Sequence, residues 1–117
     1  MVVITIAGIR NEGWRRELGR GQAVSPLYAR LYITRGVHYH PQGHEALRYL
    51  LTCPPQTDPG INPWGDCDML KVVHGGDTFY LKVDCYARSW DPNEASEDPD
   101  NDELTTRVFT CLLASEY

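Results

Sequence analysis

Three strand patterns follow one another in the second half of the chain, and no other feature constrains the fold as strongly. Residues 68–74 and 78–86 are rich in β-branched and aromatic side chains, and the Gly75-Gly76 pair between them is typical of a hairpin turn. Apolar side chains alternate with polar or tyrosine side chains in residues 78–86, and residues 105–113 also alternate. Consecutive strands of this kind favour an antiparallel sheet with helices on one face.

The first half of the chain supplies the helical patterns and one more strand. Apolar or small side chains at helical spacing predict a helix over residues 3–18 with Trp14 as its anchor, although the β-branched residues 2–5 also fit a short strand. Strict alternation predicts a half-buried strand over residues 27–34, and residues 41–52 predict a second helix that begins with Pro41. We therefore expect an α+β fold, with a two-layer, four-stranded, largely antiparallel sheet that carries two helices on one face.

Length and composition exclude several classes of protein. The chain of 117 residues fits one domain, residues 1–117, and is long enough to bury a core. It contains neither the roughly 20 consecutive apolar residues of a membrane span nor a signal peptide, so we expect a cytoplasmic protein. Its four cysteines lie at least 14 positions apart, which predicts reduced, buried thiols. No common catalytic or cofactor motif occurs, which favours a protein that is not an enzyme and has no cofactor.

Acidic side chains are concentrated toward the C-terminal end. The formal net charge is −5, yet residues 1–36 carry six arginines against two glutamates. Residues 91–103 hold seven carboxylates and no basic side chain. Such a run is typical of a solvated surface loop. It could also be a contact for a basic partner, because its electric field resembles that of a phosphate backbone. The same acidity argues against direct binding of nucleic acid.

A group of histidines is the first place where the sequence suggests metal chemistry. The HxHxxxH spacing of His38, His40 and His44 could surround a zinc ion, with His74 or Cys53 as a further ligand. The simpler interpretation is a set of exposed histidines at the turn between a strand and a helix.

Aspartates form a second candidate group. Asp58, Asp66 and Asp68 lie in the stretch DPGINPWGDCD, where paired carboxylates could bind Mg²⁺ or act in acid–base chemistry. Proline and glycine surround them, and this setting favours carboxylates that stabilise turns. A small metal-dependent hydrolase that uses these aspartates or the histidines is therefore the alternative function.

One face of the predicted strand 78–86 is both aromatic and charged. It carries Tyr80, Lys82, Asp84 and Tyr86. An open face of this composition would suit a protein partner, whereas under a helix the Lys82–Asp84 pair would contribute little. The sequence leaves both possibilities open.

Several segments together resemble a small family of bacterial proteins of unknown function that are carried on plasmids, phages and other mobile elements. The segments are GIRNEGWRREL, LYITRGV, NPWGDCDM, FYLKVDCYARSW and DPDNDELTTRVFTCLLASEY. The closing TTRVFTCLLASEY is the most specific, because that family ends in a similar strand and tail. The chain departs from the family in its version of NPWGDCD, in the Asp84-Cys85-Tyr86 triplet and in a longer acidic spacer.

The resemblance implies a cellular context. Small acidic proteins of mobile elements often blunt host defence, so we expect a non-catalytic inhibitor of the anti-CRISPR type in the bacterial cytoplasm. Its acidic surface would mimic DNA and block a basic nucleic-acid-binding groove of the effector complex. A partner-binding module of plasmid maintenance is a further alternative. The residues expected to bind the partner are acidic or aromatic: Glu94, Glu97, Asp98, Asp100, Asp102, Glu103, Trp64 and Trp90.

Overall fold

A computed structural model describes residues 3–88 and 93–117. Within these residues the helices and strands follow one another in this order: α1 (Ile6–Gly19), β1 (Ala29–Ile33), α2 (Arg35–Tyr39), α3 (Gly43–Thr52), β2 (Met69–His74), β3 (Asp77–Ala87) and β4 (Thr105–Leu113). Two short 3₁₀ helices, η1 (Asp102–Leu104) and η2 (Ala114–Glu116), flank β4. The α+β prediction is confirmed.

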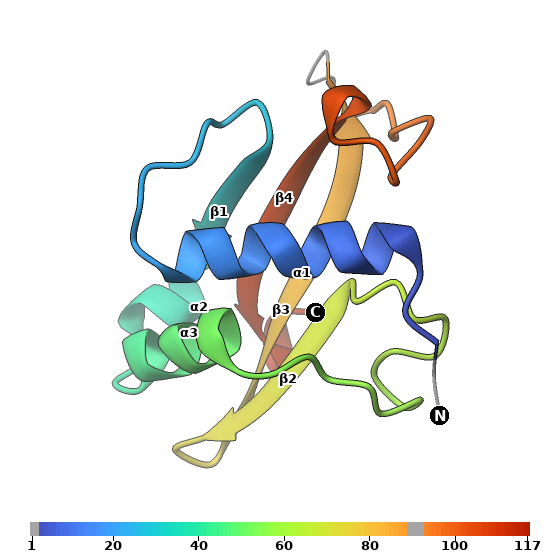
Figure 1. The fold of residues 1–117 in the computed structure, drawn as a ribbon. Coiled ribbons are helices and arrows are strands. Elements are labelled where there is room, and N and C mark those ends of the chain that lie inside the picture. The colour runs from blue at the N-terminus through green and yellow to red at the C-terminus, as the bar shows by residue number, and fades with distance from the viewer. Residues whose placement is uncertain (1–2, 89–92) are drawn as a thin grey trace.

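The strands of the described residues form one mixed sheet in the order β1-β4-β3-β2. β2 and β3 form the predicted hairpin, and β4 runs antiparallel to β3. β1 is parallel to β4, so the sheet is largely but not entirely antiparallel. Figure 1 shows α1, α2 and α3 on the same side of this sheet.

The core lies between the sheet and the helices. On β3, Phe79 and Leu81 are completely buried, as the alternation predicts, and on β4 Phe109 and Cys111 are completely buried. They belong to one apolar cluster with residues of α2 and α3, including the fully buried Leu50. Burial of this layer is the main source of stability of the fold.

Helix α2 lies between the strand predicted over residues 27–34 and the helix predicted over residues 41–52, where the sequence pattern predicts no helix. Instead, Thr34 caps a short helix by accepting a hydrogen bond from the Val37 N–H at 3.4 Å. The Glu116 carboxylate, 80 positions along the chain, accepts hydrogen bonds from the Thr34 hydroxyl at 2.6 Å and the Gly36 N–H at 3.1 Å. A side chain at Gly36 would meet this carboxylate at 2.6 Å. A contact so distant in sequence leaves no local signal.

Helix α1 also departs from its predicted form. Residues 3–5 are not a strand, and the helix begins after Thr5, which caps it. Its most buried side chain is Arg15 rather than Trp14. The Arg15 guanidinium donates hydrogen bonds to the Glu12 carboxylate, and also to the Leu50 and Cys53 carbonyls at 2.8 Å each. These carbonyls belong to the C-terminal end of α3, so a buried polar network joins the two helices.

The four cysteines are free, and three of them are buried. Burial raises the pKa of the Cys67 and Cys85 thiols, and it raises the pKa of Cys111 to about 11. These three thiols therefore stay protonated near neutral pH and are poor nucleophiles.

Among the helices of residues 3–88 and 93–117, none has the length and apolar character that a membrane span requires.

Candidate interaction surface

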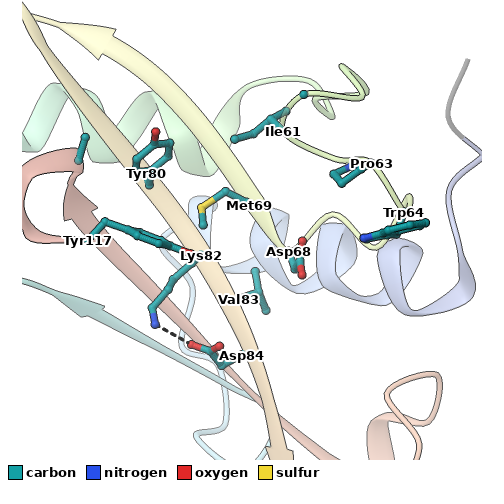
Figure 2. Close-up of a pocket in the computed structure, with 12 residues that line it drawn as sticks. Ile61, Pro63, Trp64, Asp68, Met69, Tyr80, Lys82, Val83, Asp84 and Tyr117 are labelled. Atoms are coloured by element: carbon teal, nitrogen blue, oxygen red, sulfur yellow. Dashed lines mark ion pairs between the residues drawn. The ribbon is translucent and has the colours of Figure 1, made fainter.

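The sheet face opposite the helices carries a groove of about 680 Å³. Figure 2 views this face with the helices behind the strands. The floor comes from β2 and β3, one wall from the loop before β2, and the other wall from the tail after β4. The lining residues are Gly60, Ile61, Pro63, Trp64, Asp68, Met69, Tyr80, Lys82, Val83, Asp84, Ala114 and Tyr117.

The aromatic and charged side of β3 lies on this open face. Tyr80, Lys82 and Asp84 line the groove together, which resolves the choice that the sequence left open. The Lys82 Nζ lies 3.2 Å from the Asp84 Oδ2, and the two side chains are 37% and 41% exposed. Because solvent screens this ion pair, it contributes little to stability and both groups can reach a ligand.

The loop between α3 and β2 is ordered by polar side chains. Asn62 is 1% exposed. Its amide donates to the Gln56 carbonyl at 3.2 Å, and its Oδ1 accepts from the Cys67 N–H at 3.0 Å. The Gln56 side chain in turn bonds both the N–H and the C=O of Lys71 on the edge strand β2, at 2.8 and 2.7 Å. Gln56 thus fixes the start of the loop to the sheet, and Asn62 joins the two ends of the loop to each other.

The end of the same loop is held against the start of α1. Gly65 has φ +76°, and a side chain there would lie 1.9 Å from the Val3 carbonyl oxygen, so only glycine fits. The Gly65 carbonyl accepts a hydrogen bond from the Thr5 N–H at 3.0 Å. Cys67 also adopts a left-handed conformation, with φ +53°. These constraints fix the backbone on both sides of Trp64.

Trp64 itself extends into solvent at one wall of the groove, and its side chain is 80% exposed. Figure 2 shows its indole nitrogen on the side nearer to Asp68. Tryptophan contributes strongly to binding when a partner buries it, so this exposed side chain beside the groove is a candidate contact residue. The sequence pointed to Trp64, but not to Tyr117 and Met69, which complete the groove around it.

A second cavity, of about 320 Å³, adjoins the groove and is rich in carboxylates. Asp68 and Asp84 line both cavities, and Asp66 and Asp100 line the second one. The Asp66 carboxylate accepts a hydrogen bond from the Thr5 hydroxyl at 2.6 Å. Partial burial, and then the charges of Asp66 and Asp84, raise the pKa of Asp68. The cavity therefore concentrates negative charge next to the groove.

The described part of the acidic segment, residues 93–103, is hydrogen-bonded to β3 and β4, although most of its residues are exposed. The Ala87 N–H donates to the Glu94 carbonyl and the Ser96 N–H to the Cys85 carbonyl, at 3.0 Å each. The buried Arg107 guanidinium donates hydrogen bonds to the Pro99 carbonyl and to the Asp102 carboxylate. Asp91 of the acidic run and Trp90, a predicted partner-binding residue, lie outside the described residues.

The six predicted carboxylates divide into two groups. Asp102 faces inward, where its carboxylate accepts hydrogen bonds from Arg107 at 2.9 Å and from the Trp14 indole at 3.1 Å. Glu103 accepts from the Tyr28 hydroxyl at 3.0 Å. The other four are exposed and form no ion pair with the residues that the structure describes: Glu94, Glu97, Asp98 and Asp100.

An aromatic stack lies beneath Asp102. The Trp14 and Tyr28 rings are parallel, with centroids 5.1 Å apart and planes 11° apart. The Arg88 guanidinium lies over the Tyr28 ring, with its Cζ atom 4.3 Å from the ring centroid, and it donates a hydrogen bond to the Asp102 carbonyl. Asp102 therefore has a structural role that its position in an acidic run does not reveal.

The histidines of the predicted metal site serve separate contacts. His40 bonds Asp77 at 2.7 Å through Nε2 and accepts the Gln42 N–H at 2.9 Å through Nδ1, while His38 and His44 are exposed. Across residues 3–88 and 93–117, no three His, Cys, Asp or Glu side chains are grouped so that they could hold a metal ion.

Comparison with known proteins supports the resemblance at the level of the family. No curated protein and no solved structure matches the chain. The model of a family described as proteins of unknown function, DUF3768, matches residues 33–116. The match spans the acidic segment and all of the groove lining except Tyr117. The chain therefore belongs to the DUF3768 family.

Proposed function

We propose that this protein is a non-catalytic binding protein that holds a basic partner protein on an acidic surface. We define that surface as the exposed carboxylates of the ordered segment together with those of the adjoining cavity: Glu94, Glu97, Asp98, Asp100, Asp66, Asp68 and Asp84. The observation that carries the proposal is that the segment meets the cavity at Asp100. Asp100 lines the same cavity as Asp66, Asp68 and Asp84, and that cavity opens onto the groove beside Trp64.

Charge and order both favour association with a cationic surface. Exposed carboxylates raise the rate of encounter with a basic partner protein, and they repel acidic proteins. The segment is already held by Arg107 and by its hydrogen bonds to β3, so binding would cost less conformational entropy than it would for a free loop. The raised thiol pKa values, in turn, do not favour cysteine-based catalysis.

The finer form of the proposal concerns the identity of the partner. We propose a nucleic-acid-binding groove of a bacterial defence complex, in which the acidic surface takes the place of DNA, as an anti-CRISPR protein encoded on a mobile element would do. Acidity supports this hypothesis, although the Asp102 carboxylate pairs with Arg107 and the exposed Glu103 carboxylate accepts a hydrogen bond from Tyr28. The carboxylates of the cavity replace them in the proposed contact.

The test begins with a partner captured from a host extract, identified by mass spectrometry and then purified. Its affinity is measured for the wild-type chain and for the variant Glu94→Gln/Glu97→Gln/Asp98→Asn/Asp100→Asn, here named the segment variant. We expect a partner with a basic nucleic-acid groove, competition by DNA, and an affinity at least about tenfold lower for the segment variant.

A matched control neutralises four carboxylates elsewhere: Glu17→Gln, Glu45→Gln, Asp58→Asn and Asp77→Asn. Both variants change the formal net charge from −5 to −1, so a difference in affinity between them does not come from net charge. The control also removes exposed contacts of Glu17, Glu45 and Asp77 with Arg20, His74 and His40, so thermal unfolding verifies that it is folded. The control variant should retain most of the wild-type affinity. Equal affinities for the wild-type chain and the segment variant, or turnover of a substrate by the chain, would contradict the proposal.

A further inference from the structure

We infer that the groove binds a proline-rich segment in the polyproline II conformation with a basic residue at its end. This inference rests on the proposed function, since it identifies the part of a protein partner that the groove would hold. It combines three independent features of the groove: its aromatic walls, its unused hydrogen-bond donors and the charge at one end.

The walls offer flat apolar surfaces that suit proline rings. Trp64 and Pro63 form one wall, and Tyr117, which is 77% exposed, stands on the other side of the groove. The Tyr80 and Tyr117 rings meet edge to face, with centroids 5.9 Å apart and planes 65° apart. Aromatic-lined grooves recognise proline-rich segments because the ligand is already extended and loses little entropy on binding.

The polar ends of these rings are available for a ligand backbone. The Trp64 indole N–H and the Tyr80 and Tyr117 hydroxyls have no hydrogen-bond partner among the residues that the structure describes. A polyproline II segment displays its carbonyl oxygens to the outside because it has no internal hydrogen bonds. Three donors around one groove therefore complement a ligand that supplies acceptors.

The charge of the groove selects the residue that follows the prolines. Asp84 is paired with Lys82, whereas Asp68 forms no ion pair within residues 3–88 and 93–117. Asp66 and Asp100 in the adjoining cavity add to the negative potential at that end. An arginine or lysine side chain placed there would pair with Asp68 and neutralise part of this charge.

The wall of the groove that carries Trp64 is already ordered without a ligand. The hydrogen bonds of Asn62 and the constrained Gly65 hold the loop that presents Trp64. A rigid anchor on the protein and a stiff segment on the partner together reduce the entropic cost of association.

The experiment uses three synthetic peptides and the full chain. The first is acetyl-Pro-Pro-Ala-Pro-Pro-Ala-Arg-amide, the second replaces every proline by alanine, and the third replaces arginine by citrulline. Binding is followed through the NMR signal of the Trp64 indole N–H, assigned with Trp64→Phe. We expect the first peptide to shift this signal, the alanine peptide to bind about tenfold more weakly, and the citrulline peptide to lose about threefold in affinity.

Two protein variants provide the matched comparison. Isothermal titration calorimetry, which does not depend on the Trp64 signal, compares them: Trp64→Ala should abolish binding of the first peptide, whereas Tyr39→Ala should retain it, since Tyr39 is 73% exposed on α2 and lies outside the groove. Thermal unfolding of both variants verifies that they are folded. A Trp64 signal that does not move, or equal affinities for the proline and alanine peptides, would overturn the inference. Equal affinities for the arginine and citrulline peptides would also overturn it.

The outcome can be separated from that of the proposed function. If the peptides fail but the segment variant still loses affinity for the purified partner, the groove inference is wrong and the acidic surface stands. If the first peptide binds as expected while the segment variant keeps full affinity for the partner, the groove inference stands and the proposed function is wrong.

Discussion

Two long irregular segments of this protein are ordered in different ways. The loop before β2 is closed by Asn62, which bonds residues five and six positions away in its own loop. The acidic segment is held by Arg107, whose guanidinium reaches from β4 to Asp102 and to Asn11 on α1. Both side chains are almost completely buried, at 1% and 0% exposed. One buried polar residue can therefore order a surface segment either locally or across the fold.

The largest effect should come from removing the long-range contact. Arg107→Met removes the guanidinium donor from the Asn11 oxygen, the Pro99 carbonyl and the Asp102 carboxylate, and we expect a loss of about 3 kcal/mol in the free energy of unfolding. Urea denaturation measures it, and hydrogen exchange should show faster exchange in both residues 94–103 and α1. Arg20→Met, which removes an exposed ion pair, should cost less than about 1 kcal/mol. Similar losses for the two variants would contradict the account.

Removing the local contact should have a smaller and more confined effect. Asn62→Ala leaves the Cys67 N–H and the Gln56 carbonyl unsatisfied, which should cost about 2 kcal/mol. Hydrogen exchange should accelerate in residues 58–68 while residues 94–103 stay protected. If both segments lose protection from hydrogen exchange together, the contacts of Asn62 and Arg107 do not order their segments independently.

Some of this architecture is readable from the sequence, and some is not. The faces of β3 are predicted correctly, because a half-buried strand repeats its burial every two residues. The buried face of α1 is not, since the acceptors of Arg15 lie 35 and 38 positions away. Asp102 and Asp98 look alike in an acidic run, yet only Asp102 faces Arg107. Exposure of Trp64 likewise depends on a loop conformation that its Gly and Pro neighbours only suggest.

A third contact, between the Glu116 carboxylate and the start of α2, lies at the surface and should make the stability of the fold depend on pH. Hydrogen bonds from the Thr34 hydroxyl, then the Leu113 and Gly36 N–H groups, lower the pKa of Glu116 below its ordinary value of 4.5. Its contribution to stability is therefore present above pH 4.5 and is lost as the pH falls through the lowered folded-state pKa. Glu116→Gln should make the melting temperature less dependent on pH in that acidic range. An unchanged pH profile would show that Glu116 does not stabilise α2.

The smallest effect on stability is expected from the proposed binding residues themselves. The segment variant removes carboxylates that form no ion pair with the described residues, so its free energy of unfolding should stay within about 0.5 kcal/mol of wild type. Asp102→Asn, in contrast, should be measurably destabilising because that carboxylate pairs with the buried Arg107. If the segment variant is the less stable of the two, its carboxylates are structural and the division between them is wrong.

The salt dependence of partner binding tests the acidic surface most directly. The dissociation constant for the purified partner is measured for the wild-type chain and the segment variant over a series of salt concentrations. Because salt screens exposed charges, affinity should fall steeply for the wild-type chain and much less steeply for the variant. Slopes that are equal for the two proteins would show that these carboxylates do not face the partner.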